Sequence, residues 1–69
     1  MKAIVDYFKS NAKDGWGVVS KRQMMKDILC GIEEIKQVVI ELQNRGWQFE
    51  YRVVTIGGLD YEIIEFEIN

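Results

Sequence analysis

The spacing of the apolar residues changes once along this chain, at Gly46, and that change restricts the fold more than any other feature. Before it, apolar residues recur at the three- and four-residue intervals of helices. After it, every second residue from Trp47 to Val53 is apolar, as in a half-buried strand. A pair of glycines, Gly57-Gly58, then separates two strand-like runs by two residues, which is a strong hairpin signal. The sequence therefore predicts an α+β fold in which helices precede a β-hairpin.

Three stretches carry the helical spacing, and we expect helices at about 2–12, 20–29 and 32–45. Ser20 and Gln23 have the spacing of a capping box at the start of the second helix, whose apolar face is Met24, Met25, Ile28 and Leu29. The apolar stripe of the third helix comprises Ile32, Ile35, Val38, Val39 and Leu42.

The remaining segments are predicted as turns or strands. Asn11 to Gly17 is rich in turn-forming residues, which places Trp16 in a loop, and 18–19 could form a short strand. The hairpin strands are expected at about 47–56 and 59–68. The alternation of the second strand breaks at Ile63-Ile64, which predicts a bulge or a change of face.

Composition indicates one domain, spanning residues 1–69, without catalytic chemistry. The chain has no histidine and one cysteine, Cys30, so zinc sites of the Cys/His type, an internal disulfide and histidine-based acid–base catalysis are excluded. No phosphate-binding glycine loop or nucleophile–base pair is present. We therefore expect no enzyme activity, no metal and no cofactor. No apolar run approaches the roughly 20 residues that span a bilayer, so we expect a cytoplasmic protein without a membrane partner.

The order of helix, short strand, helix, tight turn, longer helix and hairpin is that of a winged helix-turn-helix. The chain resembles the N-terminal DNA-binding domain of biotin-repressor-type regulators in the segments that carry this order. These are Val18-Val19-Ser20, then Met24, Ile28, Leu29, Ile35, Val39 and Leu42, and finally Arg45-Gly46-Trp47. The resemblance implies a small transcriptional regulator that binds double-stranded DNA, with the helix at 32–45 in the major groove and the hairpin as the wing.

Nine side chains are candidates for DNA contact. Lys21, Arg22 and Lys26 form the densest basic cluster and could bind phosphates, and Arg52 is the only cation of the hairpin. On the outward face of the third helix, Gln37 and Asn44 could bond adenine edges and Glu33 a cytosine amino group, and Ile40 could contact a thymine methyl or a partner protein. Lys36 borders the same face. The alternative for all of these is an ordinary solvated surface.

The charge distribution favours a different function. The net charge is −2 and the sequence pI is about 5.0, whereas nucleic-acid binders are usually basic. Glu33-Glu34 opens the helix where the family usually has Ser or Thr and Arg. The hairpin adds Glu50, Asp60, Glu62, Glu65 and Glu67.

Three interpretations of these features remain open. The chain could be an acidic protein-interaction module or inhibitor that binds no DNA and whose hairpin imitates a row of phosphates. The hairpin charges could instead discourage aggregation at an edge strand. A homodimer could form through the apolar outer positions Ile40, Val54 and Ile56.

Overall fold

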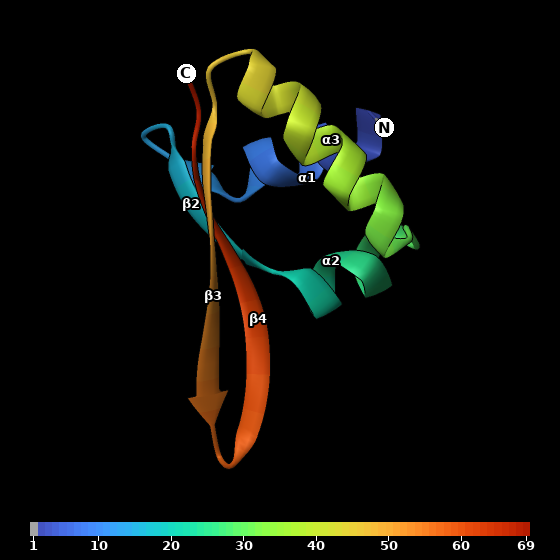
Figure 1. Ribbon diagram of the computed structural model, residues 1–69, viewed down its shortest axis with the longest axis vertical. Coiled ribbons are helices and arrows are strands. Elements are labelled where there is room, and N and C mark those ends of the chain that lie inside the picture. The colour runs from blue at the N-terminus through green and yellow to red at the C-terminus, as the bar shows by residue number, and fades with distance from the viewer. Residues whose placement is uncertain (1) are drawn as a thin grey trace.

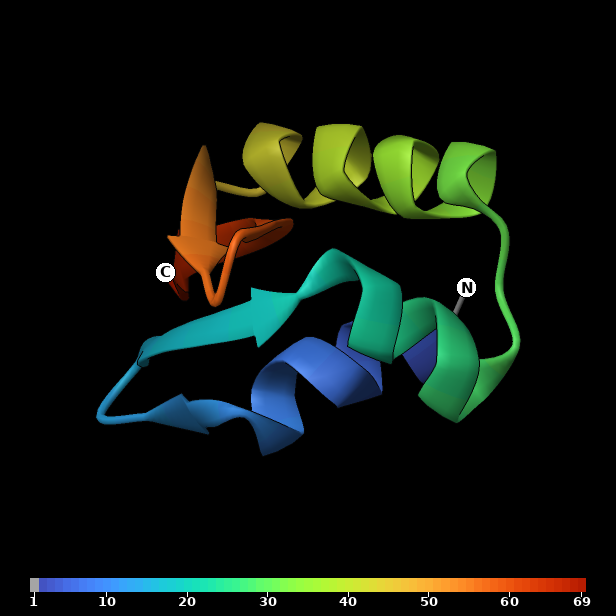
Figure 2. The ribbon, with the colours of Figure 1, turned by 90° about the horizontal axis from the view of Figure 1, so that it is seen from below.

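Three helices and a four-stranded antiparallel sheet make up the computed structural model, which describes residues 2–69 (Figure 1). The helices lie together on one face of the sheet, and the opposite face carries no second layer (Figure 2). This confirms the prediction of an α+β fold in which the helices come before the long hairpin. In chain order the elements are α1 (Lys2–Ser10), β1 (Ala12–Lys13), β2 (Trp16–Ser20), α2 (Lys21–Ile28), α3 (Ile32–Asn44), β3 (Gln48–Ile56) and β4 (Leu59–Glu67).

The last strand, β4, lies in the middle of the sheet, whose order is β1-β2-β4-β3. It pairs with β2 from Trp16↔Glu67 to Ser20↔Ile63, and with β3 from Gln48↔Glu67 to Ile56↔Leu59. Of the acidic residues of β4, Glu65 and Glu67 therefore lie between two paired strands, whereas Asp60 and Glu62 have no strand partner on the β2 side.

Of the two alternatives predicted at Ile63-Ile64, the bulge is wrong, since the register of β4 runs without interruption against both neighbours, and the change of face is confirmed. Ile64 lies on the buried inner face, whereas Ile63 lies on the outer face between Ser20 and Arg52 and is half-buried. An apolar residue on each face, rather than an extra residue, explains the break in alternation.

The segment predicted as a turn between α1 and the short strand is itself a small hairpin. Ala12 and Lys13 pair with Gly17 and Trp16 around Asp14-Gly15, where both residues have positive φ values of 57° and 80°. The short strand expected at 18–19 extends over Trp16–Ser20, so Trp16 belongs to a strand, although its side chain is exposed.

The core joins the helices to the base of the long hairpin. Phe8 of α1 is fully buried, and its ring lies 5.0 Å from Phe66, 5.4 Å from Phe49 and 6.5 Å from Trp47, all edge-on. Aromatic pairs in this geometry add about 0.5–1.5 kcal/mol each to the free energy of burial. This aromatic cluster anchors only the first part of the hairpin and leaves the rest to project from the body of the molecule (Figure 1).

Local hydrogen bonds mark the end of α1 and the start of α2. The Tyr7 carbonyl accepts both the Asn11 backbone N–H at 3.2 Å and the Asn11 side-chain amide at 2.8 Å, and α1 ends at Ser10 rather than at 12. Ser20 caps α2 by accepting the Gln23 N–H at 3.3 Å, as predicted, but the Gln23 side chain bonds Asp27 instead of returning to Ser20.

The connection between α2 and α3 also differs from the expectation. Leu29 adopts a left-handed φ of 50°, which ends α2 at Ile28. Its side chain is 89% exposed, and Ile32 at the start of α3 is also exposed. Neither residue belongs to the apolar core face on which the sequence placed it.

Candidate functional site

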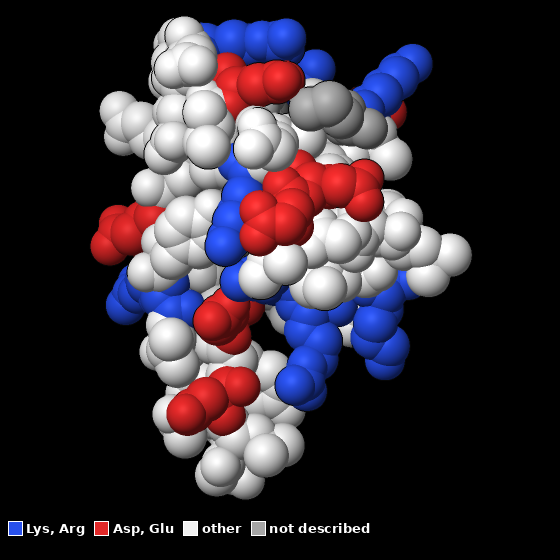
Figure 3. Space-filling model, turned by 45° about the vertical axis from the view of Figure 1, so that its right-hand side comes forward, with Lys and Arg blue, Asp and Glu red and all other residues white. Residues whose placement is uncertain are grey.

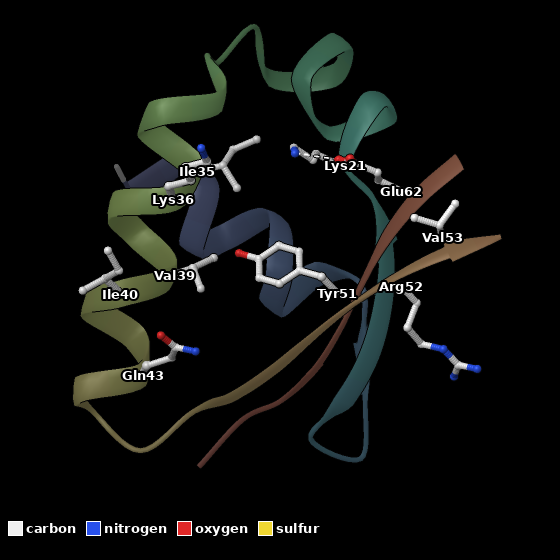
Figure 4. A pocket seen from close by; sticks show the side chains of 10 residues that line it. All are labelled: Lys21, Ile35, Lys36, Val39, Ile40, Gln43, Tyr51, Arg52, Val53 and Glu62. Carbon is white, nitrogen blue, oxygen red and sulfur yellow. Dashed lines mark hydrogen bonds and ion pairs between the residues drawn. The ribbon is translucent and has the colours of Figure 1, made fainter. Parts of the chain in front are cut away.

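A cleft of about 510 Å³ separates α3 from the inner face of the long hairpin (Figure 4). Its floor is formed by Ile35 and Val39 of α3, which are buried. Its rim carries Ile40, Tyr51 and Val53, which are 51%, 53% and 65% exposed. We call this the α3–hairpin cleft. Its lining residues are Lys21, Ile35, Lys36, Val39, Ile40, Gln43, Tyr51, Arg52, Val53 and Glu62.

The apolar rim is exposed because β3 is longer than the layer of helices that covers its inner face. Alternation places Phe49, Tyr51 and Val53 on the same inner face of β3. Phe49 is half-buried in the aromatic cluster, but Tyr51 and Val53 extend past the helices, and the Tyr51 ring points into the space beside Val39 (Figure 4). Burial also raises the pKa of the Tyr51 phenol, which keeps it uncharged at neutral pH.

The three cations that border the cleft are all paired with carboxylates of the same chain. Lys21 Nζ lies 2.6 Å from Glu62, and its side chain is only 17% exposed. Arg52 lies 2.5 Å from Glu65 and turns away from the cleft toward the outer face of the sheet (Figure 4). Lys36 lies 3.7 Å from Glu33 one helical turn away.

These ion pairs shift the titration of their partners. The hydrogen bond and the positive charge of Lys21 lower the pKa of Glu62, and the hydrogen bond to Glu65 raises the pKa of Arg52. Glu62 and Arg52 are therefore fully charged at neutral pH. A phosphate that approached either cation would meet the negative charge of the carboxylate that the cation already holds.

A second, more open hollow lies between α2 and the hairpin. Leu29 and Ile32 supply exposed apolar surface there. Arg22 and Lys26 supply exposed cations, and neither forms an ion pair with another residue in the range 2–69. Where the helices and hairpin meet, acidic and basic side chains are interspersed and the basic ones form no continuous band (Figure 3).

The structure separates the nine residues predicted to contact DNA into three groups. Lys21, Lys36, Ile40 and Arg52 line the α3–hairpin cleft, whereas Arg22 and Lys26 line the hollow beside α2. The others, Glu33, Gln37 and Asn44, are exposed on α3 and line neither hollow.

Sequence reasoning missed Tyr51 and Val53 as candidate site residues. Their alternation with Trp47 and Phe49 correctly predicts a shared face, but alternation alone does not show that the second half of this face is exposed. The length of the strand could have indicated this exposure. A nine-residue strand reaches about 30 Å, and no helix of this chain could cover all of it.

The described residues contain no cluster of three or more metal-binding side chains. Cys30 is a free, half-buried thiol whose pKa is raised, first by burial and then by Glu34, so the reactive thiolate is disfavoured. Within residues 2–69, no helix is both long enough and apolar enough to span a membrane.

Comparison of the chain with protein-family models, with curated proteins and with solved structures found no match in any of the three.

Proposed function

We propose that this chain is a protein-interaction module that binds an apolar segment of another polypeptide in the α3–hairpin cleft. The observation that carries the proposal is the composition of the cleft rim. Ile40, Tyr51 and Val53 are all more than half exposed around an apolar floor, while each bordering cation is held by a carboxylate of the chain itself. Concave apolar surfaces with a few polar groups are typical of binding sites.

The charge around the cleft supports a protein partner over DNA. Duplex binding depends on cations that are free to neutralise phosphates. The hairpin strands carry Glu50, Asp60, Glu62, Glu65 and Glu67 against the single cation Arg52, and α3 carries Glu33, Glu34 and Glu41 against Lys36. A phosphate backbone laid along α3 and the hairpin would meet net negative charge on both.

A test is to select binders from a random-peptide display library and to measure their affinity for wild type, Ile40→Asp and Gln37→Asp. Both variants add one negative charge to an exposed position of α3, but only Ile40 lines the cleft. We expect Ile40→Asp to weaken binding by at least about tenfold, which corresponds to roughly 1.4 kcal/mol, and Gln37→Asp to leave it within about twofold. Selection of no peptide, or equal binding by all three proteins, would contradict the proposal.

A second candidate function is DNA binding as a winged helix-turn-helix regulator. The order of the helices and strands supports it, together with the sheet order β2-β4-β3 and the exposed cations Arg22 and Lys26 of α2. Titration with random duplex at about 50 mM salt separates the two functions. Affinity that falls on replacing Arg22 and Lys26 by alanine, and is unchanged in Ile40→Asp, would favour DNA. Undetectable affinity at that salt would exclude it.

A further inference from the structure

The outer edge of β3 is open to pairing with another strand. The sheet order places no strand beyond β3, and the four consecutive residues from Glu50 to Val53 are exposed. Natural edge strands are usually protected by proline, lysine, a bulge or a short length. Residues 48–56 contain no proline or lysine, and β3 runs through nine uninterrupted pairs with β4. Apart from the charges of Glu50 and Arg52, the usual obstacles to strand addition are therefore missing from this edge.

The turn at Gly57-Gly58 determines which backbone groups of β3 are free. Both glycines have positive φ values, 58° and 80°, as in a type I′ turn, so Ile56 and Leu59 form the hydrogen-bonded pair that closes the hairpin. Hydrogen-bonded and non-hydrogen-bonded pairs alternate along an antiparallel ladder. The N–H and C=O groups of the odd-numbered residues, Phe49, Tyr51, Val53 and Thr55, therefore point away from β4.

The same odd-numbered residues carry the inner-face side chains. A residue of an added antiparallel strand that bonds the backbone of Tyr51 or Val53 would consequently place its own side chain on the inner face, next to the exposed rim of the cleft. Apolar side chains suit those positions, because Tyr51 and Val53 are the exposed apolar neighbours there.

On the outer face, the alternate positions of an added strand would meet negative charge. Glu50 lies directly opposite Glu65, and Glu67 follows two residues later on β4. Like charges placed directly opposite one another are destabilising. The single cation of this strand, Arg52, is already bonded to Glu65. A basic side chain opposite Glu50 would relieve this repulsion.

We propose that the segment bound at the cleft is extended, alternates apolar with basic residues, and pairs with the free edge of β3 as a fifth strand, antiparallel like every other pairing in this sheet. This inference rests on the proposed function and specifies the chemistry and conformation of the partner. Main-chain bonds to the odd-numbered residues of β3 set the register of the bound segment. The cleft selects apolar side chains on the inner face, and Glu50 selects basic side chains on the outer face.

The probe that tests strand addition is an end-capped peptide of alternating valine and lysine, prepared in three forms. One form is unmodified, one is N-methylated at the valines and one at the lysines. The valines would face the cleft, so their N–H groups are the ones that bond β3. We expect N-methylation at valine to weaken binding by at least about tenfold, and N-methylation at lysine to change it by less than about twofold.

Changes in the protein provide a second measurement. Val53→Pro removes a backbone N–H that points to solvent and leaves the β3–β4 ladder intact, whereas Val53→Ala removes the same side chain and keeps the N–H. Both variants lose the Val53 side chain from the cleft rim, so we expect both to weaken binding, and Val53→Pro to weaken it by at least about tenfold more than Val53→Ala. Hydrogen exchange should also show that the unmodified peptide protects the amides of Phe49, Tyr51, Val53 and Thr55.

Three outcomes would overturn the inference. Equal affinity for the two N-methylated peptides, combined with sensitivity to Ile40→Asp, would leave cleft binding intact and exclude strand addition. Failure of every displayed peptide and of the valine–lysine peptide to bind would reject the proposed function as well. Concentration-dependent protection of the odd-numbered β3 amides in the protein alone would assign the edge to a second copy of this chain.

Discussion

Replacing Gly17 with alanine tests whether the close approach of β2 to β4 holds the sheet against α1. A Cβ at this position would lie 2.4 Å from the Asn11 carbonyl oxygen and 2.7 Å from the Phe66 ring. Ordinary van der Waals contact begins near 3.4 Å, so each neighbour must retreat by more than about half an ångström. Neither can do so freely, because the Asn11 carbonyl belongs to the backbone that directly follows α1, and Phe66 is buried with its ring 5.0 Å from that of Phe8.

The expected cost of Gly17→Ala lies at the upper end of the range for overpacking, about 2–3 kcal/mol. A chain of 69 residues has a total stability of about 3–10 kcal/mol, so this is a large fraction of it. For a domain of this size the melting temperature should fall by roughly 10–20 °C.

Urea denaturation followed by tryptophan fluorescence measures the change in free energy of unfolding directly. Gly31→Ala is the matched control, since the nearest atom to its new Cβ would be 3.6 Å away, in the flexible Glu34 side chain. We expect the control to cost less than about 1 kcal/mol. If Gly17→Ala were no more destabilising than Gly31→Ala, the steric reasoning about β2 and β4 would be refuted.

Two further predictions concern the core and a hydrogen bond between helices. Phe8→Ala should cost about 3–5 kcal/mol in urea denaturation, because the fully buried ring contacts three other rings; a cost below about 1 kcal/mol would show that the aromatic cluster does not anchor the hairpin. The Tyr7 hydroxyl donates to Asp27 at 2.7 Å; burial and this bond raise the pKa of Tyr7 to about 12, and the bond lowers the pKa of Asp27. The bond therefore stabilises the fold at neutral pH, and its contribution is lost as pH falls through the lowered pKa of Asp27 or rises from 10 toward about 12. Melting temperatures across this range should show Tyr7→Phe below wild type at pH 7 and converging with it at the acid end; a constant difference would contradict the assignment.

The order of elements could be predicted from the sequence because each relevant signal is local. Helical spacing within α3 and the paired glycines between β3 and β4 involve residues close in the chain. The small hairpin of β1 and β2 was missed because two strand residues carry no periodicity. Leu29 and Ile32 were assigned to the core by spacing alone, but the left-handed turn at Leu29 directs this connection into solvent.

The candidate site was only partly predictable, because its character depends on pairs distant in the chain. Lys21 meets Glu62 across 41 positions, and Arg52 meets Glu65 from the neighbouring strand. Counting charges along the sequence identified these cations correctly but could not show that carboxylates already hold them. The exposed rim was equally hard to predict from the sequence, since Tyr51 and Val53 continue the same alternation as Trp47 and Phe49 before them.

The central position of β4 has a consequence for how the chain acquires its shape. β2 and β3 are not neighbours in the sheet. Each pairs instead with β4, the strand that follows both in the chain. During synthesis, α1, α2 and α3 can all emerge from the ribosome while the sheet still lacks its middle. Assembly must therefore wait for Ile64 and Phe66, and a polypeptide released before these residues would present the undersides of its helices to quality-control proteases.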